Sequence, residues 1–222
     1  MEARRIKNII RMLFPIGAMI GALFGFAGTW NLPFAWACLG VFVAFAVVIV
    51  SKIDPSLRAE RLNPAPGGKD RHLRRAMLPF ILGCWIVAGL DVGRFHWSDP
   101  VPFGWRVAGL IGLAAALGLA FWAMMANRFF SPVVRIQQER GHHLITAGPY
   151  QYLRHPGYLG TIGGQLFGTL ALGSWWALLP ALGIVFLIVR RTALEDQFLY
   201  RELEGYTAYA ERVRYRLLPG VW

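Results

Sequence analysis

The sequence predicts an all-α, polytopic integral-membrane helical bundle with a C-terminal helical hairpin and a cytoplasmic amphipathic tail. Of its 222 residues, 56% are hydrophobic and 16% are charged, a composition unlike that of soluble domains. Residues 12–51 form a run of 40 without a charged side chain, and residues 107–127 form another of 21. One membrane-crossing helix needs about 20 such residues. We therefore expect a single integral-membrane domain, residues 1–222, without a separate soluble catalytic domain.

The basic residues are distributed asymmetrically along the chain, whose net charge is +11. Four of them lie within residues 4–11 and seven within residues 52–75, whereas the opposite loops are nearly free of them. This positive-inside pattern places both termini, the 51–75 loop and residues 128–155 in the cytoplasm. It argues against a nucleic-acid partner, and it suits contact with anionic membrane lipids. A bacterial inner membrane and an endoplasmic reticulum membrane both fit, and the compact chain favours the first.

The first predicted unit is an N-terminal helical hairpin, residues 12–50. A turn signal with an interfacial tryptophan, Thr29–Pro33, divides the apolar run into helices at about 12–29 and 34–50. The run continues into a second helix without a small-residue cleavage pattern, so we expect it to be retained.

The third and fourth helices are predicted within residues 76–126. The run from Ala76 to Leu90 has 15 residues, about 22 Å of helix against about 30 Å of hydrocarbon. We therefore expect this helix to continue through Asp91 and Arg94, which are spaced i, i+3. A paired interfacial cluster is favoured over a functional ion site. An outer turn at 98–104 leads into the fourth helix, 105–126.

The remaining region, residues 127–222, contains the last predicted membrane elements. Residues 127–154 mix aromatic and charged side chains, as expected of an element in the headgroup plane. Residues 156–189 form a run of 34 without charge that breaks near Gly173, which predicts a short hairpin and a total of six membrane segments. A polar amphipathic tail follows at 192–204. Glycines on the first arm would admit a helix or a ligand close to the backbone: Gly157, Gly160, Gly163, Gly164 and Gly168.

The two cysteines, Cys38 and Cys84, lie inside apolar runs. They are interpreted as small buried hydrophobic residues, and neither a disulfide nor a metal site is expected.

Four segments concentrate polar residues on the predicted cytoplasmic side: 58–75, 135–155, 190–204 and 205–222. Their convergence on one face predicts one site. The densest stretch places Arg154 and His155 at the mouth of the glycine-rich hairpin, with Pro156 suited to the first turn of its helix. A cation and an imidazole there could hold an anionic group or could anchor the chain in lipid headgroups.

Two separated signatures in this chain resemble a known family. The first comprises Asn127–Gln137, Glu139–His143, Thr146–Tyr150 and Arg154–Gly160, and the second comprises Leu194–Asp196, Gly205–Tyr209 and Arg212–Trp222. Their order and spacing resemble the isoprenylcysteine carboxyl methyltransferase and phospholipid methyltransferase superfamily. The resemblance covers about residues 125–222, and more weakly Arg58–Arg61 and Gly68–Asp70.

This resemblance implies an integral-membrane enzyme that transfers a methyl group from S-adenosylmethionine to a lipid-like acceptor, with residues 127–222 as the catalytic region. Its catalytic residues would be Arg154, His155 and Glu195, and Tyr209 and Arg214 would bind the acceptor or anchor the tail in the membrane. Many relatives have paired glutamates where this chain has Glu195–Asp196. The cofactor would lie between the last hairpin and the C-terminal segment, bound by Tyr150, Arg154, His155, Tyr158, Gly160, Glu195 and Asp196.

The residue types agree with such a pocket. S-adenosylmethionine carries a sulfonium, an ammonium and a carboxylate, so its site needs an acid, a cation and an aromatic or apolar wall. Methyl transfer depends mainly on positioning. A carboxylate acceptor, as in isoprenylcysteine, needs no general base, whereas an amine must be neutral to attack.

Three alternatives remain open at this stage. The acceptor could be a phospholipid amine. Membrane sterol reductases, which use NADPH, share an Arg-His-Pro-x-Tyr-x-Gly stretch, but they usually have Asn at the position of Gly157 and an acid at that of Thr161. A non-enzymatic lipid-binding protein would leave the acids and aromatic residues of the tail unexplained. Glu195 could also be a surface acid that pairs with Arg191 at i, i+4.

Overall fold

The computed structural model describes residues 2–98 and 100–222. All the regular elements in these ranges are helical, which confirms the predicted fold class. In chain order they are α1 (Glu2–Ala27), α2 (Pro33–Lys52), α3 (Pro55–Leu62), α4 (Arg71–Gly89) with a π-helical turn (Leu90–Phe95), α5 (Phe103–Ala126), two 3-10 turns (Gln138–Arg140 and Gly148–Gln151), α6 (Pro156–Leu172), α7 (Leu178–Glu202) and α8 (Tyr206–Arg212).

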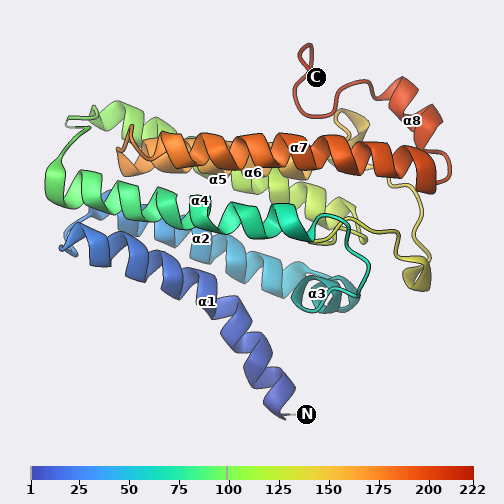
Figure 1. The fold of residues 1–222 in the computed structure, drawn as a ribbon, viewed down its shortest axis with the longest axis horizontal. Helices are drawn as coiled ribbons and strands as arrows, with labels where there is room; N and C mark the ends of the chain where they lie inside the picture. Colours follow the sequence, from blue (N-terminus) through green and yellow to red (C-terminus); the bar gives the residue numbers. More distant parts are fainter. Residues whose placement is uncertain (1, 99) are drawn as a thin grey trace.

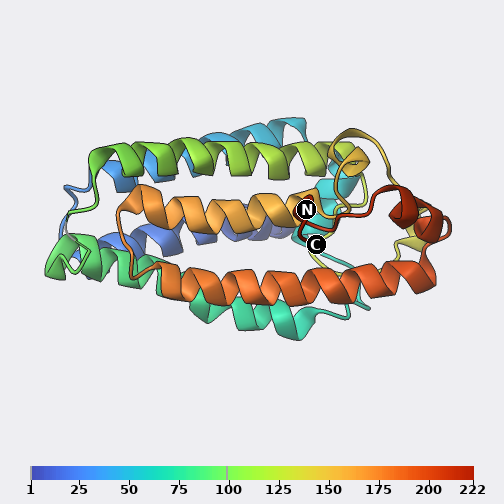
Figure 2. The ribbon, with the colours of Figure 1, turned by 90° about the horizontal axis from the view of Figure 1, so that it is seen from above.

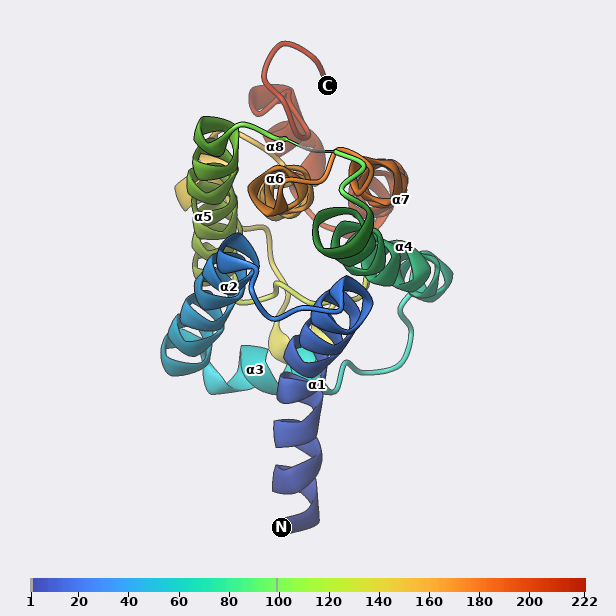
Figure 3. The ribbon, with the colours of Figure 1, turned by 90° about the vertical axis from the view of Figure 1, so that its left-hand side faces the viewer.

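The long helices lie side by side along the long axis of the molecule (Figures 1 and 2). Seen along the bundle, α5, α6 and α7 form one layer, α1 and α2 form another, and α4 lies between α1 and α7 (Figure 3). The first part of α1 projects away from this bundle. Helices α3 and α8 and the 127–155 segment all lie at one end of the bundle, which we call the polar end (Figure 1).

The helix lengths and surfaces are those of a membrane protein. Three helical segments are long and apolar enough to cross a bilayer: 33–52, 71–95 and 103–126. A shorter apolar stretch covers 13–27. Large apolar side chains point outward along the bundle, such as Phe186, which is 61% exposed. Such faces suit contact with lipid. The six-segment count stays a prediction.

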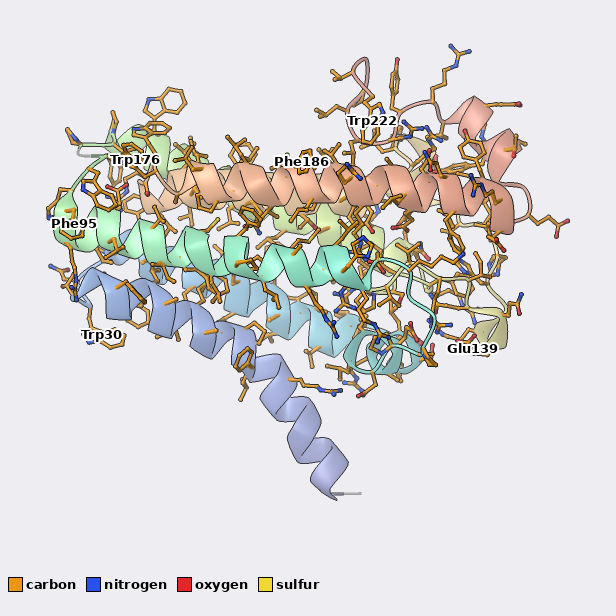
Figure 4. All side chains as sticks on the ribbon, in the orientation of Figure 1. Trp30, Phe95, Glu139, Trp176, Phe186 and Trp222 are labelled. Carbon is orange, nitrogen blue, oxygen red and sulfur yellow. The ribbon has the colours of Figure 1, made fainter. Side chains whose placement is uncertain are left out.

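The side chains differ between the two ends of the bundle. Trp30, Phe95 and Trp176 lie at one end, and Glu139 lies at the polar end (Figure 4). Aromatic residues gather at membrane–water interfaces because their rings are amphipathic. The arrangement suits a bundle that crosses the bilayer lengthwise.

The helix boundaries differ from the prediction at two places. The first helix begins at Glu2 and not near residue 12, because the basic N-terminal residues continue the helix beyond the apolar run. The second arm of the hairpin and the polar tail form one continuous helix, α7, which ends at Glu202. Its polar half is therefore held rigidly in line with its apolar half.

The expected pairing of Asp91 with Arg94 is wrong, although the third helix does continue through both residues as a π-helical turn. Asp91 is fully buried, and its carboxylate accepts hydrogen bonds from the Ser98 backbone N–H (2.8 Å) and the Ser174 hydroxyl (2.6 Å). The Arg94 guanidinium lies against Gly28 instead. Buried carboxylates need such donors, and here they tie α4 to the turn before α7.

Residues 127–155 contain no long helix and fold back over the polar end. The side chain of Gln137 is buried and donates a hydrogen bond to the Phe129 carbonyl (2.7 Å). Arg135 forms a 2.7 Å ion pair with Glu60 of α3. Internal hydrogen bonds of this kind replace those of a helix.

Helices α5 and α6 pack closely against each other, and this contact depends on glycine. A Cβ atom at Gly160 would lie 2.6 Å from the Ala116 carbonyl oxygen and 2.7 Å from the Ala120 nitrogen, both on α5. Small residues let membrane helices approach backbone to backbone in this way.

We predict that Gly160→Ala lowers the thermal unfolding midpoint of the detergent-solubilised protein, because the methyl group would separate α5 from α6 at a cost of about 1–3 kcal/mol. Gly164→Ala is the matched control, since a Cβ there would lie an ordinary 3.9 Å from Leu117. That variant should be neutral or slightly stabilising. Equal midpoints for the two variants would contradict the close packing at Gly160.

Candidate active site

The site begins where an irregular segment leads into α6. Pro156 occupies the first position of α6, where its missing N–H costs no hydrogen bond. The residue before a proline disfavours helical geometry, and His155 lies outside the helix with φ −129° and ψ 58°. The backbone N–H groups of Arg154 and His155 donate to the carbonyls of Tyr215 and Arg216, each at 3.0 Å. The C-terminal segment is thereby fixed against the entrance of α6.

Asp196 of α7 is the centre of a buried polar cluster. It is 0% exposed, and its carboxylate accepts hydrogen bonds from the Tyr206 hydroxyl (2.6 Å) and Arg216 Nε (2.7 Å). His155 Nε2 lies 3.2 Å from the same carboxylate, and Arg154 Nη1 lies 3.1 Å from it. We call these five residues the Asp196 cluster. It joins the start of α6, the C-terminal part of α7, α8 and the C-terminal segment.

Two titrating groups of this cluster have displaced pKa values. Burial alone would raise the pKa of Asp196, but hydrogen bonds from His155, Tyr206 and Arg216 hold it well below its ordinary value. Burial and the hydrogen bond to Asp196 raise the pKa of Tyr206. At neutral pH the carboxylate is therefore charged and the phenol is neutral.

Helix α8 completes the enclosure from the other side. The Tyr209 hydroxyl, on a residue that is 3% exposed, donates to the Tyr150 carbonyl at 2.7 Å. The rings of Tyr206 and Tyr209 meet edge to face and pack with Leu199 of α7 and with Leu203 directly after it. These apolar contacts bury the polar cluster beneath them.

A cavity of about 270 Å³ opens beside the Asp196 cluster at the polar end. Its volume is near the lower end of small-molecule pockets. Residues of all four convergent segments line it, which confirms that these segments meet. Among its lining residues are Arg61, Arg74, Phe130, His142, Tyr150, Arg154, His155, Tyr158, Arg191, Glu195, Tyr206 and Tyr209.

Glu195 and Tyr158 form the acidic and aromatic part of this cavity. The Tyr158 hydroxyl donates to Glu195 Oε2. The Tyr158 ring stacks on His155 with 5.7 Å between centroids, and the Arg191 guanidinium lies 5.2 Å from its centroid. Arg191 forms its ion pair with Asp70 (2.7 Å), so the alternative pairing with Glu195 is not observed. A carboxylate beside an aromatic ring is suited to a cationic group.

The other predicted site residues lie outside the cavity lining. Asp196 lies behind it, where it holds Arg154 and His155. Gly160 packs against α5, and the Arg214 side chain is exposed while its carbonyl accepts a 3.2 Å hydrogen bond from Arg154. Their roles as ligand-binding residues therefore gain no geometric support.

Sequence reasoning missed Arg61 and Arg74 as lining residues. They belong to a segment that was expected at the site, but no motif distinguishes them from the neighbouring cations Arg58 and Arg75. Only the pairing of helices α3 and α4 with the rest of the bundle turns them inward.

A comparison with known families gives one match. Residues 107–201 match the model described as the isoprenylcysteine carboxyl methyltransferase (ICMT) family. The matched region contains most of α5, the 127–155 segment, α6 and nearly all of α7. The part of the C-terminal signature from Gly205 onward lies beyond it. The resemblance found in the sequence is confirmed.

Two curated relatives are similar over parts of the chain. The cobalt-zinc-cadmium resistance protein CzcN of Cupriavidus metallidurans is 28% identical over 159 residues, which cover 66% of this chain and 68% of that protein. A probable protein-S-isoprenylcysteine O-methyltransferase of Oryza sativa subsp. indica is 37% identical over 97 residues, covering 40% and 47%. The chain thus spans about half the length of the rice relative.

We predict that Asp196→Asn releases the C-terminal segment. The amide would leave the buried Arg154 and the partly buried Arg216 without a counter-charge, and breaking a buried ion pair typically costs about 3–5 kcal/mol. Limited trypsin digestion followed by mass spectrometry should show faster cleavage after Arg212 and Arg214. Glu202→Gln, an exposed acid on the same helix, should digest as the wild type does, and an unchanged rate in Asp196→Asn would show that the cluster does not hold this segment.

We also predict an acid sensitivity that depends on His142. Burial, together with the positive charges of His143, Arg135 and Arg140, lowers the pKa of His142 from 6.5 to about 4. The unfolded chain then binds more protons between these values, so stability falls as the pH drops through this window. The thermal unfolding midpoint should fall between about pH 7.5 and about pH 5, and it should fall less in His142→Asn than in the wild type. An equal fall of the midpoint in the variant and the wild type would show that other titrating groups cause the acid sensitivity.

Proposed function

We propose that this chain is a membrane methyltransferase of the ICMT family that transfers a methyl group from S-adenosylmethionine to the carboxylate of a lipid-like, isoprenylcysteine-type acceptor. The observation that carries the proposal is the cavity lined by Arg154, His155 and Glu195, three residues of the region that matches the family model. In this proposal residues 127–222 form the catalytic region of a single membrane domain. The polar end faces the cytoplasm, together with both termini, and the membrane is a bacterial inner membrane.

The residues of the cavity fit the proposed cofactor. S-adenosylmethionine supplies an electrophilic methyl group on a sulfonium. Glu195 would hold one of its cationic groups, and the Tyr158 ring would face the other. The Nε atom of Arg154 is buried without a hydrogen-bond partner among the described residues, and an oxygen atom of a ligand would satisfy it.

The chain's own residues would act by positioning and by excluding water. The Asp196 cluster fixes the side chains of Arg154 and His155, so neither must be reorganised when ligands bind. Helix α8 closes the cavity beside Tyr206 and Tyr209. An apolar acceptor would enter from the bilayer, while a water-soluble cofactor would enter from the polar end.

The charges of the cavity favour a carboxylate over an amine acceptor. Arginines are the most numerous charged residues of its lining, and Glu195 is its one acid among the described residues. An amine acceptor would need a general base. His155 and Glu195 are already hydrogen-bonded to Asp196 and Tyr158, so neither is a free base.

The reductase alternative fits the local packing poorly. A Cβ atom at Gly157 would lie 2.5 Å from the Phe130 ring, so the asparagine typical of those enzymes would require that ring to move. The Thr161 hydroxyl donates to the Gly157 carbonyl at 2.9 Å, where the reductases have an acid. The non-enzymatic alternative predicts that the protein transfers no methyl group, and the methyl-transfer assay below tests it.

The first test is binding of S-adenosylmethionine, S-adenosylhomocysteine and NADPH to the detergent-purified protein by calorimetry. We expect the two adenosyl ligands to bind and NADPH not to bind. Glu195→Ala and His155→Ala should weaken adenosyl binding about tenfold or more, as expected for a lost hydrogen bond to a charged group. Glu202→Ala, on the exposed side of α7, is the matched control.

The second test measures methyl transfer to two acceptors in separate assays. N-acetyl-S-farnesylcysteine offers a carboxylate, and its product is detected as a base-labile methyl ester. Phosphatidylethanolamine offers an amine. Esterification lost in Glu195→Ala would support the proposal. Methylation of the amine alone would show that the acceptor is an amine and not a carboxylate. In the calorimetric test, binding of NADPH alone would favour a reductase, and binding of none of the three ligands would favour a lipid-binding protein.

A further inference from the structure

Three arginines from separate helices face the cavity together. Arg61 belongs to α3, Arg74 to the first turn of α4, and Arg191 to α7. We call them the arginine cluster. Arg61 and Arg74 lie outside the residues that match the family model, so the match does not assign them a role.

The positive charge of this cluster is only partly balanced. Arg191 pairs with Asp70 at 2.7 Å, and its Nη2 donates to the Pro132 carbonyl, also at 2.7 Å. In the described part of the chain, no ion pair involves Arg61 or Arg74. The contacts of Arg61 are the carbonyl of Phe130, at 3.4 Å, and its ring, 5.4 Å from the centroid.

Arg135, a neighbouring arginine of the same cavity, has its charge balanced by two carboxylates. It forms 2.7 Å ion pairs with both Glu60 and Glu139. Glu60, which is on α3 next to Arg61, therefore balances Arg135 and not the arginine cluster. Burial and the charges of Arg74 and Arg191 lower the pKa of Arg61, as expected of cations held together.

The cluster lies beside the candidate reaction centre. The Arg191 guanidinium is 5.2 Å from the centroid of the Tyr158 ring, and the hydroxyl of that ring bonds Glu195. Tyr158 thus separates the acid that suits a cationic group from the arginines that suit an anion. Arginine binds carboxylate and phosphate oxygens through its planar fork of donors.

We propose that Arg61, Arg74 and Arg191 form a subsite for an anionic group of the methyl acceptor, a carboxylate or a phosphate. This inference rests on the proposed methyltransferase function. The subsite selects acceptors that carry an anion on an apolar tail, and it orients them toward the centre at Tyr158 and Glu195. Arg61 and Arg74 determine this specificity, because neither forms an ion pair within the described chain, and Asp70, the acid whose charge acts on Arg74, is already paired with Arg191.

The experiment compares ligands that share a tail and differ in charge. Calorimetry measures the dissociation constants of N-acetyl-S-farnesylcysteine and its carboxamide, and of farnesyl phosphate and farnesol, for the full-length protein in detergent. The first pair measures the contribution of a carboxylate to binding, and the second pair measures that of a phosphate. The variants are Arg61→Gln and Arg74→Gln, with Arg58→Gln on α3 and Arg75→Gln on α4 as matched exposed controls. Binding of S-adenosylhomocysteine is measured for every variant.

We expect the wild type to bind at least one anionic ligand about tenfold or more tightly than its neutral counterpart. Each cluster variant should reduce that ratio about tenfold, whereas both controls keep it. Binding of S-adenosylhomocysteine should stay unchanged in all variants, which also shows that they fold.

Other outcomes overturn the inference. An unchanged ratio in both cluster variants, or no preference for the anionic ligands in the wild type, would show that the arginines do not hold the acceptor. Weaker S-adenosylhomocysteine binding at an unchanged ratio would assign them to the cofactor. If the wild type binds no adenosyl ligand, the proposed methyltransferase function is contradicted but the subsite is still tested. The anionic and neutral ligands are compared without the cofactor, so their result does not depend on adenosyl binding.

Discussion

The arrangement of the polar end depends on one buried carboxylate. Asp196 is fully buried and holds donors from the entrance of α6, from α8 and from the C-terminal segment. Removing a charge from water is costly, and only several donors together offset that cost. The carboxylate is therefore stable only when all of these elements are in place. This mutual requirement links segments more than 40 residues apart in the chain, as Arg154 and Asp196 are.

The membrane bundle supplies the rigidity that this cluster needs. Helix α6 packs closely against α5 through Gly160, so the position of His155 at its start is set by a backbone contact and not by flexible side chains. Helix α7 continues without interruption from its apolar half to Glu202, and it carries Glu195 and Asp196 on successive positions. One of these side chains faces the cavity and the other faces away from it. The structure thus places one of two adjacent acids in the cavity wall and the other in the cluster that supports it.

Much of the fold could be predicted from the sequence, because a bilayer imposes a simple length and polarity rule on helices. The predicted C-terminal hairpin, the continuation of the third helix and the convergence of four polar segments were confirmed. The pairing of Asp91 with Arg94 was wrong, because helical spacing says which residues share a face but not which donors a turn brings from elsewhere. Ser174 lies 83 positions from Asp91 in the chain, and no local pattern reveals it.

The same limit applies to charge. Arg61 and Arg74 were counted among the cations that orient a membrane protein, and Arg58 and Arg75 beside them fit that interpretation. An orienting cation needs only to remain on one side of the bilayer, so it can stay in water. Arg61 and Arg74 instead line a cavity, and Glu60, the acid nearest in sequence to Arg61, is paired with Arg135. Burying cations together is unfavourable unless an anion joins them. The topogenic interpretation explains why Arg61 and Arg74 are at the polar end, and the proposed anionic ligand would explain why they line a cavity.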